Sequence, residues 1–205
     1  MQLDEYRKLA EVEDRMWYFE ALNRRFVHWL ARLLPPGPAN ILDAGCGVGW
    51  STLRLAGAFP DHFVLGVDQS LDRLTRGKPA PTPANAAFVR ADLVDFWRLL
   101  GRAGVRLARH YLLYPNPWPK IGQVARRWPG HAVFPEMLAL GGVLECRSNW
   151  KIYIEEMAFA LEFLTGRPVA VEAWHPARPL TPFERKYLES GHPLWRCVSD
   201  PGPAG

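Results

Sequence analysis

Apolar residues recur at intervals of three and four along the first part of the chain and gather into short runs farther on. From 4 to about 34 they follow helical spacing among many charges, which predicts an amphipathic helix that ends at Pro35 and Pro36. Short apolar runs bounded by turn residues predict buried strands at 40–44, 62–67, 87–90, 105–113 and 143–146. The intervening segments predict helices at 51–58, 71–76, 94–100, 131–140 and 149–164. Two more strand-like segments, joined by a proline-rich loop, are 168–173 and 194–198.

The alternation of strands and helices defines the expected architecture. It is typical of an α/β fold with a doubly wound, mostly parallel sheet, here of seven strands. The 205 residues suit one domain, in which we expect a helical segment at 1–38, an α/β core at 39–198 and a short tail at 199–205. Sheets of this kind bind ligands outside the carboxyl ends of their strands. Candidate chemistry is therefore sought at those ends.

Composition narrows the class of protein. With 48% hydrophobic and 22% charged residues, the chain has the composition of a globular domain. No apolar run reaches the roughly 20 residues of a membrane span, and the first residues do not form a signal peptide, so we expect no membrane association. The cysteines Cys46, Cys146 and Cys197 match neither a disulfide framework nor a zinc site, so we expect no metal and a reducing, cytoplasmic setting. Most of the 19 prolines fall in five clusters, which should mark loops.

A glycine-rich turn follows the first predicted strand. It reads Asp43-Ala44-Gly45-Cys46-Gly47-Val48-Gly49, and glycines at alternate positions permit unusual φ angles and close approach of a ligand to the backbone. The next two strands also end in carboxylates, Asp68 and Asp92, and parallel strands bring their carboxyl ends to one edge. A tight turn without a ligand is the alternative. The sequence excludes a P-loop, because no G-K-[ST] follows, and it lacks the third glycine of the dinucleotide-binding G-x-G-x-x-G.

This pattern resembles the class I S-adenosylmethionine-dependent methyltransferases, which have a Rossmann-like fold. The resemblance implies S-adenosyl-L-methionine as the cofactor, and carboxylates suit its positively charged sulfonium. The cofactor-binding residues that it implies are Asp43, Gly45, Cys46, Gly47 and Gly49 for the methionine end, Asp68 and Gln69 for the ribose, and Asp92 and Leu93 for the adenine.

A rigid, proline-rich segment follows the fourth predicted strand. It reads Leu113-Tyr114-Pro115-Asn116-Pro117-Trp118-Pro119-Lys120. Alternate prolines hold the chain extended, while Asn116 supplies an amide and Trp118 a large aromatic face. A flat base could stack on that face while the amide bonds its edge; a stiff loop that packs a tryptophan against the sheet is the alternative. The position after the fourth strand, where a methyltransferase substrate lies, favours the binding function.

The segment resembles the F-P-D-P-W-P-K signature of the bacterial tRNA (guanine-N7) methyltransferases. Further elements follow in that family's order between about residues 40 and 196, including paired arginines, Gly141-Gly142 and a T-x-x-E element at 181–184. The resemblance implies methyl transfer to guanine N7, whose in-plane lone pair needs no general base. It implies Asn116, Trp118 and Lys120 as catalytic residues. As substrate-binding residues it implies Asn116, Lys120, Arg126, Arg127, Ser148, Asn149, Tyr153, Thr181 and Glu184.

Four departures separate this chain from the family pattern, and one of them is conservative: Asp68 stands where the family has a glutamate at the end of the second strand. The acid between the two prolines is Asn116 here, the Thr-Asp after the fifth strand is Ser148-Asn149, and the basic stretch after the lysine is thinned at 121–125. Guanine presents its N1–H and N2 amine as adjacent donors, which a carboxylate accepts and an amide matches only in part. We therefore interpret the chain as a divergent member, with its substrate choice or activity in question.

Two other functions stay open. Asn116-Pro117-Trp118 resembles the N-P-P-[YFW] loop of amino methyltransferases with one proline missing, which would indicate an exocyclic amine or a small molecule as substrate. The other is a cofactor-binding or RNA-binding protein without catalysis. An acid-free stretch between Asp95 and Glu136 favours tRNA or another RNA as partner, although a solvated basic face is the alternative, and we expect a monomer or weak homodimer. The basic residues of this stretch are Arg98, Arg102, Arg106, Arg109, Lys120, Arg126 and Arg127.

Overall fold

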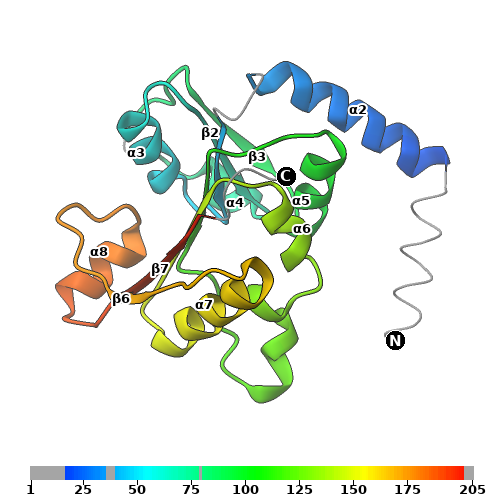
Figure 1. The fold of residues 1–205 in the computed structure, drawn as a ribbon. Helices are drawn as coiled ribbons and strands as arrows, with labels where there is room; N and C mark the ends of the chain where they lie inside the picture. Colours follow the sequence, from blue (N-terminus) through cyan, green and yellow to red (C-terminus); the bar gives the residue numbers. More distant parts are fainter. Residues whose placement is uncertain (1–16, 36–39, 79, 201–205) are drawn as a thin grey trace.

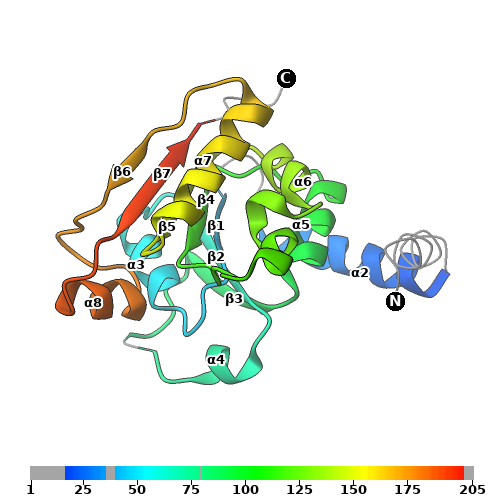
Figure 2. The same cartoon turned by 90° about the horizontal axis from the view of Figure 1, so that it is seen from below.

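A single mixed sheet organises the molecule. The computed structural model describes residues 17–35, 40–78 and 80–200. The strands in these ranges are β1 (Asn40–Ala44), β2 (Phe63–Asp68), β3 (Ala86–Arg90), β4 (Arg109–Leu113), β5 (Val143–Ser148), β6 (Val171–Ala173) and β7 (Trp195–Ser199). They hydrogen-bond in the order β3-β2-β1-β4-β5-β7-β6. Figures 1 and 2 show this sheet in two orientations. Strands β1 to β5 are parallel and β7 is antiparallel to both of its neighbours, which confirms the predicted doubly wound, mostly parallel sheet of seven strands.

Helices cover both faces of the sheet. They are α2 (Trp17–Leu33), α3 (Trp50–Ala58), α4 (Leu71–Thr75), α5 (Leu93–Arg102), α6 (Phe134–Ala139), α7 (Lys151–Thr165) and α8 (Pro182–Glu189). Leu55 of α3 packs with Ile41 and Val64 in a smaller core, whereas α2, α5, α6 and α7 enclose a larger one that includes Trp97 and Ile154. Figure 2 shows α3 on one side of the sheet and α5, α6 and α7 on the other.

The alternation of side chains along β1 determines the face of the sheet on which Asp43 lies. Leu42 and Ala44 belong to the larger core, and Ile41 belongs to the smaller core beneath α3. Because successive side chains of a strand point to opposite faces, Asp43 faces the same side as Ile41. The Asp43 carboxyl therefore lies beside the start of α3.

The structure corrects the predicted elements at several places. The loop expected between the last two strands contains α8, which begins at Pro182 because proline suits the first turn and Thr181 Oγ1 accepts a hydrogen bond from the Glu184 N–H at 3.0 Å. Strand β4 begins at Arg109, four residues later than predicted, and α6 begins at Phe134, three residues later. Residues 17–33 confirm the described part of the expected first helix, and residues 4–16 of that prediction lie outside the described residues.

The carboxyl ends of β1 to β4 lie at one edge of the sheet, and the segments that follow them form the site. Two short 3-10 helices, η1 (Ile121–Arg126) and η2 (Trp128–Gly130), continue the segment after β4. In the described part of the chain, no helix is both long and apolar enough to cross a membrane.

Candidate active site

The glycine loop turns the chain from β1 into α3. Gly45, Gly47 and Gly49 have φ angles of 77°, 57° and 83°, in the left-handed region that glycine adopts without strain. At Gly49 an added Cβ would also lie 2.5 Å from the ring of Phe88. Backbone conformation and neighbouring side chains therefore both require glycine at this position.

Asp43 is buried on the α3 side of the sheet. Its Oδ2 accepts hydrogen bonds from Ser51 Oγ at 2.6 Å and Thr52 Oγ1 at 2.7 Å, and no described residue donates to its Oδ1. Burial raises the pKa of Asp43 to about 6 against the effect of these two hydrogen bonds, and the charge of Asp68 raises it further. The site thus contains a buried carboxylate with one unpaired oxygen.

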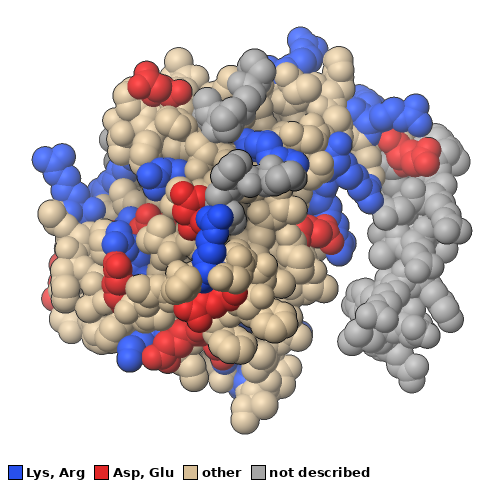
Figure 3. Space-filling model, in the orientation of Figure 1, with Lys and Arg blue, Asp and Glu red and all other residues tan. Residues whose placement is uncertain are grey.

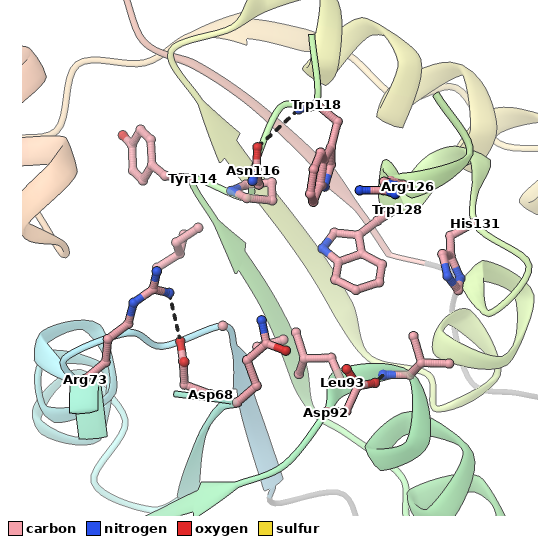
Figure 4. Close-up of a pocket in the computed structure, with 16 residues that line it drawn as sticks. Asp68, Arg73, Asp92, Leu93, Tyr114, Asn116, Trp118, Arg126, Trp128 and His131 are labelled. Carbon is pink, nitrogen blue, oxygen red and sulfur yellow. Dashed lines mark hydrogen bonds and ion pairs between the residues drawn. The ribbon is translucent and has the colours of Figure 1, made fainter. Parts of the chain in front are cut away.

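Asp68 ties the end of β2 to the glycine loop. Its Oδ2 accepts a hydrogen bond from the Gly47 N–H at 2.9 Å and its Oδ1 one from the Ser70 N–H at 2.8 Å. Arg73 of α4 forms an ion pair with the same carboxylate, with 3.7 Å between Nη1 and Oδ2 (Figure 4). Each carboxylate oxygen has two lone pairs, so Asp68 can still accept from hydroxyl groups of a ligand.

A cavity of about 390 Å³ opens at this edge of the sheet, within the size range of ligand pockets. Asp92, at the start of α5, is exposed in its wall and caps the helix, with Oδ1 accepting from the Val94 N–H at 2.8 Å. Of the predicted cofactor residues, the wall contains Gly45, Asp68, Gln69, Asp92 and Leu93. Those that lie outside it are Asp43, Cys46, Gly47 and Gly49.

The proline-rich loop after β4 supplies the opposite wall (Figure 4). Tyr114 and Trp118 have φ angles of 55° and 42°, a region that costs residues other than glycine conformational energy. The exposed Asn116 accepts a hydrogen bond from the Trp118 N–H at its Oδ1, at 3.2 Å. All three side chains line the cavity.

Two neighbouring arginines hold Trp118 in different ways. Arg127 is buried and donates from Nε and Nη2 to the Trp118 carbonyl, at 3.1 and 3.0 Å, while it forms an ion pair with Glu156 of α7. Arg126 is exposed, lines the cavity and lies over the Trp118 ring, with its guanidinium carbon 4.9 Å from the ring centre. The predicted substrate residues therefore separate: Arg126 reaches the cavity, and Arg127 fixes the loop that forms it.

Glu184 lies in the interior, although the family resemblance implies that it meets the substrate. It has no exposed surface, and its Oε1 accepts from Tyr114 Oη at 2.9 Å, Arg147 Nη1 at 3.0 Å and Trp174 Nε1 at 3.1 Å. Burial and the neighbouring Glu184 charge raise the pKa of Tyr114, so its hydroxyl stays protonated as a donor. Glu184 therefore fastens α8, which Thr181 caps, to the wall of the cavity.

Four other predicted substrate residues are also outside the cavity wall. Ser148 is buried and its Oγ accepts from the Trp150 N–H at 3.1 Å. Tyr153 is buried and its hydroxyl accepts from the Trp128 N–H at 3.3 Å. Asn149 is half-buried, and Lys120 is exposed immediately before η1.

The cavity residues that were not predicted for the site include Arg73, Trp128 and His131. The ring of Trp128 packs edge-on against buried Trp97, with 4.7 Å between ring centres. His131 Nδ1 accepts from the Val133 N–H at 3.1 Å, and burial together with the charge of Arg98 lowers the pKa of this histidine. Trp128 lies in the acid-free stretch, which was the one signal for it, whereas no motif surrounds Arg73 or His131.

The acid-free stretch does not form one basic surface. Because α5 starts at the cavity edge with Asp92 as its cap and runs back across the sheet, residues at its far end and before β4 lie at the amino edge. Arg98 pairs with Glu136 at 3.3 Å, and Figure 3 shows basic and acidic side chains interspersed over one face. Lys120 and Arg126 remain in the loop segment that follows the carboxyl end of β4. The residues at the amino edge are Arg102, Arg106 and Arg109.

Sequence comparisons connect this chain to methyltransferases. The family described as "putative methyltransferase" matches residues 38–197. The tRNA (guanine-N(7)-)-methyltransferase of Streptomyces coelicolor is 31% identical, over 89% of this chain and 72% of that protein. The protein of the same name from Bordetella parapertussis is 33% identical, over 76% of this chain and 65% of its own length. The chain thus spans slightly less than two thirds of that relative.

Solved structures share the fold at low sequence identity. An antibiotic-related methyltransferase superposes with a TM-score of 0.60 at 16% identity, covering 84% of this chain and 93% of that one. The 16S rRNA methyltransferase KamB gives a TM-score of 0.53 at 19% identity, covering 83% of this chain and 91% of that one.

The described residues contain no cluster of three or more histidine, cysteine or acidic side chains that could hold a metal ion.

Proposed function

Because this chain belongs to the putative methyltransferase family, which it matches over residues 38–197, we propose that it transfers a methyl group from S-adenosylmethionine to N7 of a guanine in tRNA. One observation carries the proposal: a single cavity has acids from the ends of β2 and β3 on one wall and the Asn116–Trp118 loop on the other. Relatives named tRNA (guanine-N(7)-)-methyltransferase support this substrate class. The core from β1 to β7 would be the catalytic unit.

The acids fit a cationic cofactor that carries a ribose. Asp68 keeps lone pairs for the ribose hydroxyls, and Asp92 beside Leu93 offers an acceptor for the adenine amine. Asp43 adds buried negative charge, with an oxygen to which no described residue donates, and a nearby cation would stabilise that charge. When bound, S-adenosylmethionine supplies a methyl group activated by its sulfonium.

Positioning is the main task left to the chain. Guanine N7 attacks with an in-plane lone pair, so no proton leaves N7 and no general base is required. Trp118 offers a flat face for the base to stack on, and Asn116 and Arg127 hold the backbone N–H and carbonyl of Trp118. A rigid wall of this kind lowers the entropic cost of the in-line approach.

The surroundings of the cavity suit an RNA. Lys120 and Arg126 are exposed on the loop side, and Arg73 is exposed on α4. Helix α8 approaches the glycine loop, since its exposed Arg185 lies over Trp50, with 5.2 Å between the guanidinium carbon and the ring centre. Such arginines can contact phosphates and stack on bases.

Methyl transfer to tRNA is the direct test. Purified protein is incubated with S-adenosylmethionine and a panel of tRNA transcripts, with DNA and protein as competing acceptors, and the nucleosides are analysed by mass spectrometry. We expect 7-methylguanosine in at least one transcript. Its absence from every transcript would overturn the proposal, and methyl transfer to another acceptor would redirect it.

The cofactor site is tested separately by calorimetry. Asp68→Ala should weaken S-adenosylmethionine binding at least about tenfold, because the carboxylate both holds the Gly47 N–H and faces the cavity. Asp72→Ala is the matched control, since Asp72 is exposed and pairs with Arg76 four residues on. Equal affinities for the two variants would show that the cofactor binds elsewhere.

A further inference from the structure

The oxygen and the nitrogen of the Asn116 side-chain amide differ in their hydrogen bonding. A backbone N–H is only a donor, so the atom that accepts from Trp118 N–H must be the carbonyl oxygen Oδ1. The amine end, Nδ2, has no acceptor among the described residues, and the side chain is exposed in the cavity wall. Figure 4 shows the oxygen toward Trp118 and the amine on the opposite side of the group. Asn116 therefore has a donor left for a ligand, while its oxygen is engaged in the loop.

Three other polar side chains on this wall, those of Arg126, Trp128 and His131, are donors as well. Arg126 has no acceptor atom, and the indole N–H of Trp128 is only a donor. His131 uses Nδ1 to accept from the Val133 N–H, which leaves the proton of the neutral ring on Nε2. Tyr114 is different, because it donates its only hydroxyl proton to buried Glu184 and has no donor left for a ligand.

The carboxylates near the cavity do not offset this bias. Glu184 is fully buried and already accepts from Tyr114, Arg147 and Trp174. Asp68 and Asp92 lie on the wall formed by β2 and α5, where the cofactor would bind. The wall that faces the substrate therefore favours a base edge that presents acceptors rather than the N1–H and N2 donors of guanine.

We propose that Asn116 Nδ2 donates a hydrogen bond to O6 of the target guanine, the acceptor next to N7. Asn116 is then a specificity-determining residue that reads the same edge as the methylated atom. This inference rests on the proposed function and deepens it, because it names the atom of the substrate that the loop recognises. It also reverses the expectation that an asparagine here weakens recognition of guanine.

Base analogues at the methylated position test this contact. The guanosine located by mass spectrometry is replaced, by ligation of RNA fragments, with inosine or with 2-aminopurine riboside. Inosine lacks the N2 amine and keeps O6, whereas 2-aminopurine lacks O6 and keeps the N2 amine. In the presence of S-adenosylhomocysteine, we expect inosine RNA to bind within about threefold of guanosine RNA and 2-aminopurine RNA about tenfold more weakly. Binding is measured because loss of O6 also alters the intrinsic reactivity of N7.

Asn116→Asp is the decisive variant, since one carboxylate oxygen can still accept from the Trp118 N–H while the other replaces the donor with an acceptor. Methylation of guanosine RNA should fall at least about tenfold in kcat/KM, because an acceptor would then face O6. The same substitution should change the affinity for 2-aminopurine RNA much less, because that RNA has no O6 for Asn116 to contact. The effects of the variant and of the analogue are therefore not additive. Gln123→Glu in η1 is the matched control, because it adds the same charge to the same segment outside the cavity wall and should affect all three RNAs equally.

The outcomes separate the two proposals. If no transcript acquires 7-methylguanosine, the proposed function fails and the premise of this contact fails with it. If 7-methylguanosine forms but inosine RNA binds as weakly as 2-aminopurine RNA, the contact to O6 alone is overturned. A gain in kcat/KM for Asn116→Asp on guanosine RNA would likewise overturn it, because that gain requires a carboxylate that accepts from N1–H and the N2 amine.

Discussion

At the scale of single residues, the burial of Asp43 opposes folding at neutral pH. Ser51 and Thr52 donate to one of its oxygens, yet burial still raises the pKa of this carboxyl from 3.8 to about 6. The folded state therefore binds the proton more tightly than the unfolded state does. The stability that the protonated Asp43 carboxyl contributes below pH 4 is therefore lost as the pH rises to 6, and it stays lost at higher pH.

Asp43→Asn removes this titration. Relative to the native protein, the variant should gain about 3 kcal/mol in free energy of unfolding between pH 4 and pH 7, since each pKa unit is worth about 1.4 kcal/mol. Urea unfolding of both proteins at several pH values measures the difference. A stability difference that stays constant from pH 4 to pH 7 would show that the carboxyl is not perturbed. Saturating S-adenosylmethionine should reduce the pH-dependent difference in stability between the two proteins, because its sulfonium cation would stabilise the Asp43 carboxylate.

Arg127 shows why residue roles were harder to predict than residue positions. The family resemblance implies that it contacts the substrate together with Arg126, its neighbour in a basic stretch. The structure separates them, since Glu156 of α7 and the Trp118 carbonyl draw Arg127 into the interior. Which of two neighbouring arginines is buried depends on a helix about thirty residues later. A local pattern carries no information about that contact.

At the scale of elements, α8 connects the carboxyl-terminal part of the chain to the active-site wall. Three prolines at 176, 179 and 182 predicted a loop, but Pro182 occupies the first turn of a helix, where its missing N–H is harmless. The helix then places Glu184 where its carboxylate accepts a hydrogen bond from the Tyr114 hydroxyl. The sequence signal for the helix is Thr181 followed three residues later by Glu184, a pair for which the family resemblance implies substrate binding.

Glu184→Gln should destabilise the protein by about 3 kcal/mol, because an amide presents one acceptor oxygen to several buried donors and no longer balances Arg147, which retains Glu145. Glu189→Gln on the same helix should change stability by less than about 0.5 kcal/mol, since Glu189 is exposed. Denaturant unfolding of the two variants measures both effects. Equal losses would show that Glu184 does not connect α8 to the core.

At the scale of the whole molecule, the order of elements predicted the fold better than it predicted the surface. Alternating strands and helices identified a parallel sheet, and three acids at successive strand ends were expected at one edge; Asp68 and Asp92 line the cavity and Asp43 lies buried on the α3 side of the sheet. The acid-free stretch between Asp95 and Glu136, whose basic residues run from 98 to 127, favours an RNA partner. Helix α5 crosses the sheet within that stretch, so its charges divide between two opposite edges. Distance along the chain is a poor measure of proximity when a helix intervenes.

This division predicts unequal roles for two exposed arginines of the same stretch. Arg126→Ala should weaken tRNA binding several-fold and reduce the salt dependence of binding by about one charge, because Arg126 lines the cavity. Arg106→Ala removes the same charge at the amino edge and should leave both quantities nearly unchanged. Filter binding between 50 and 200 mM salt, a range over which phosphate contacts have large effects, measures the two slopes. If both variants lose affinity equally, tRNA spans both edges of the sheet, and the basic stretch acts as one surface after all.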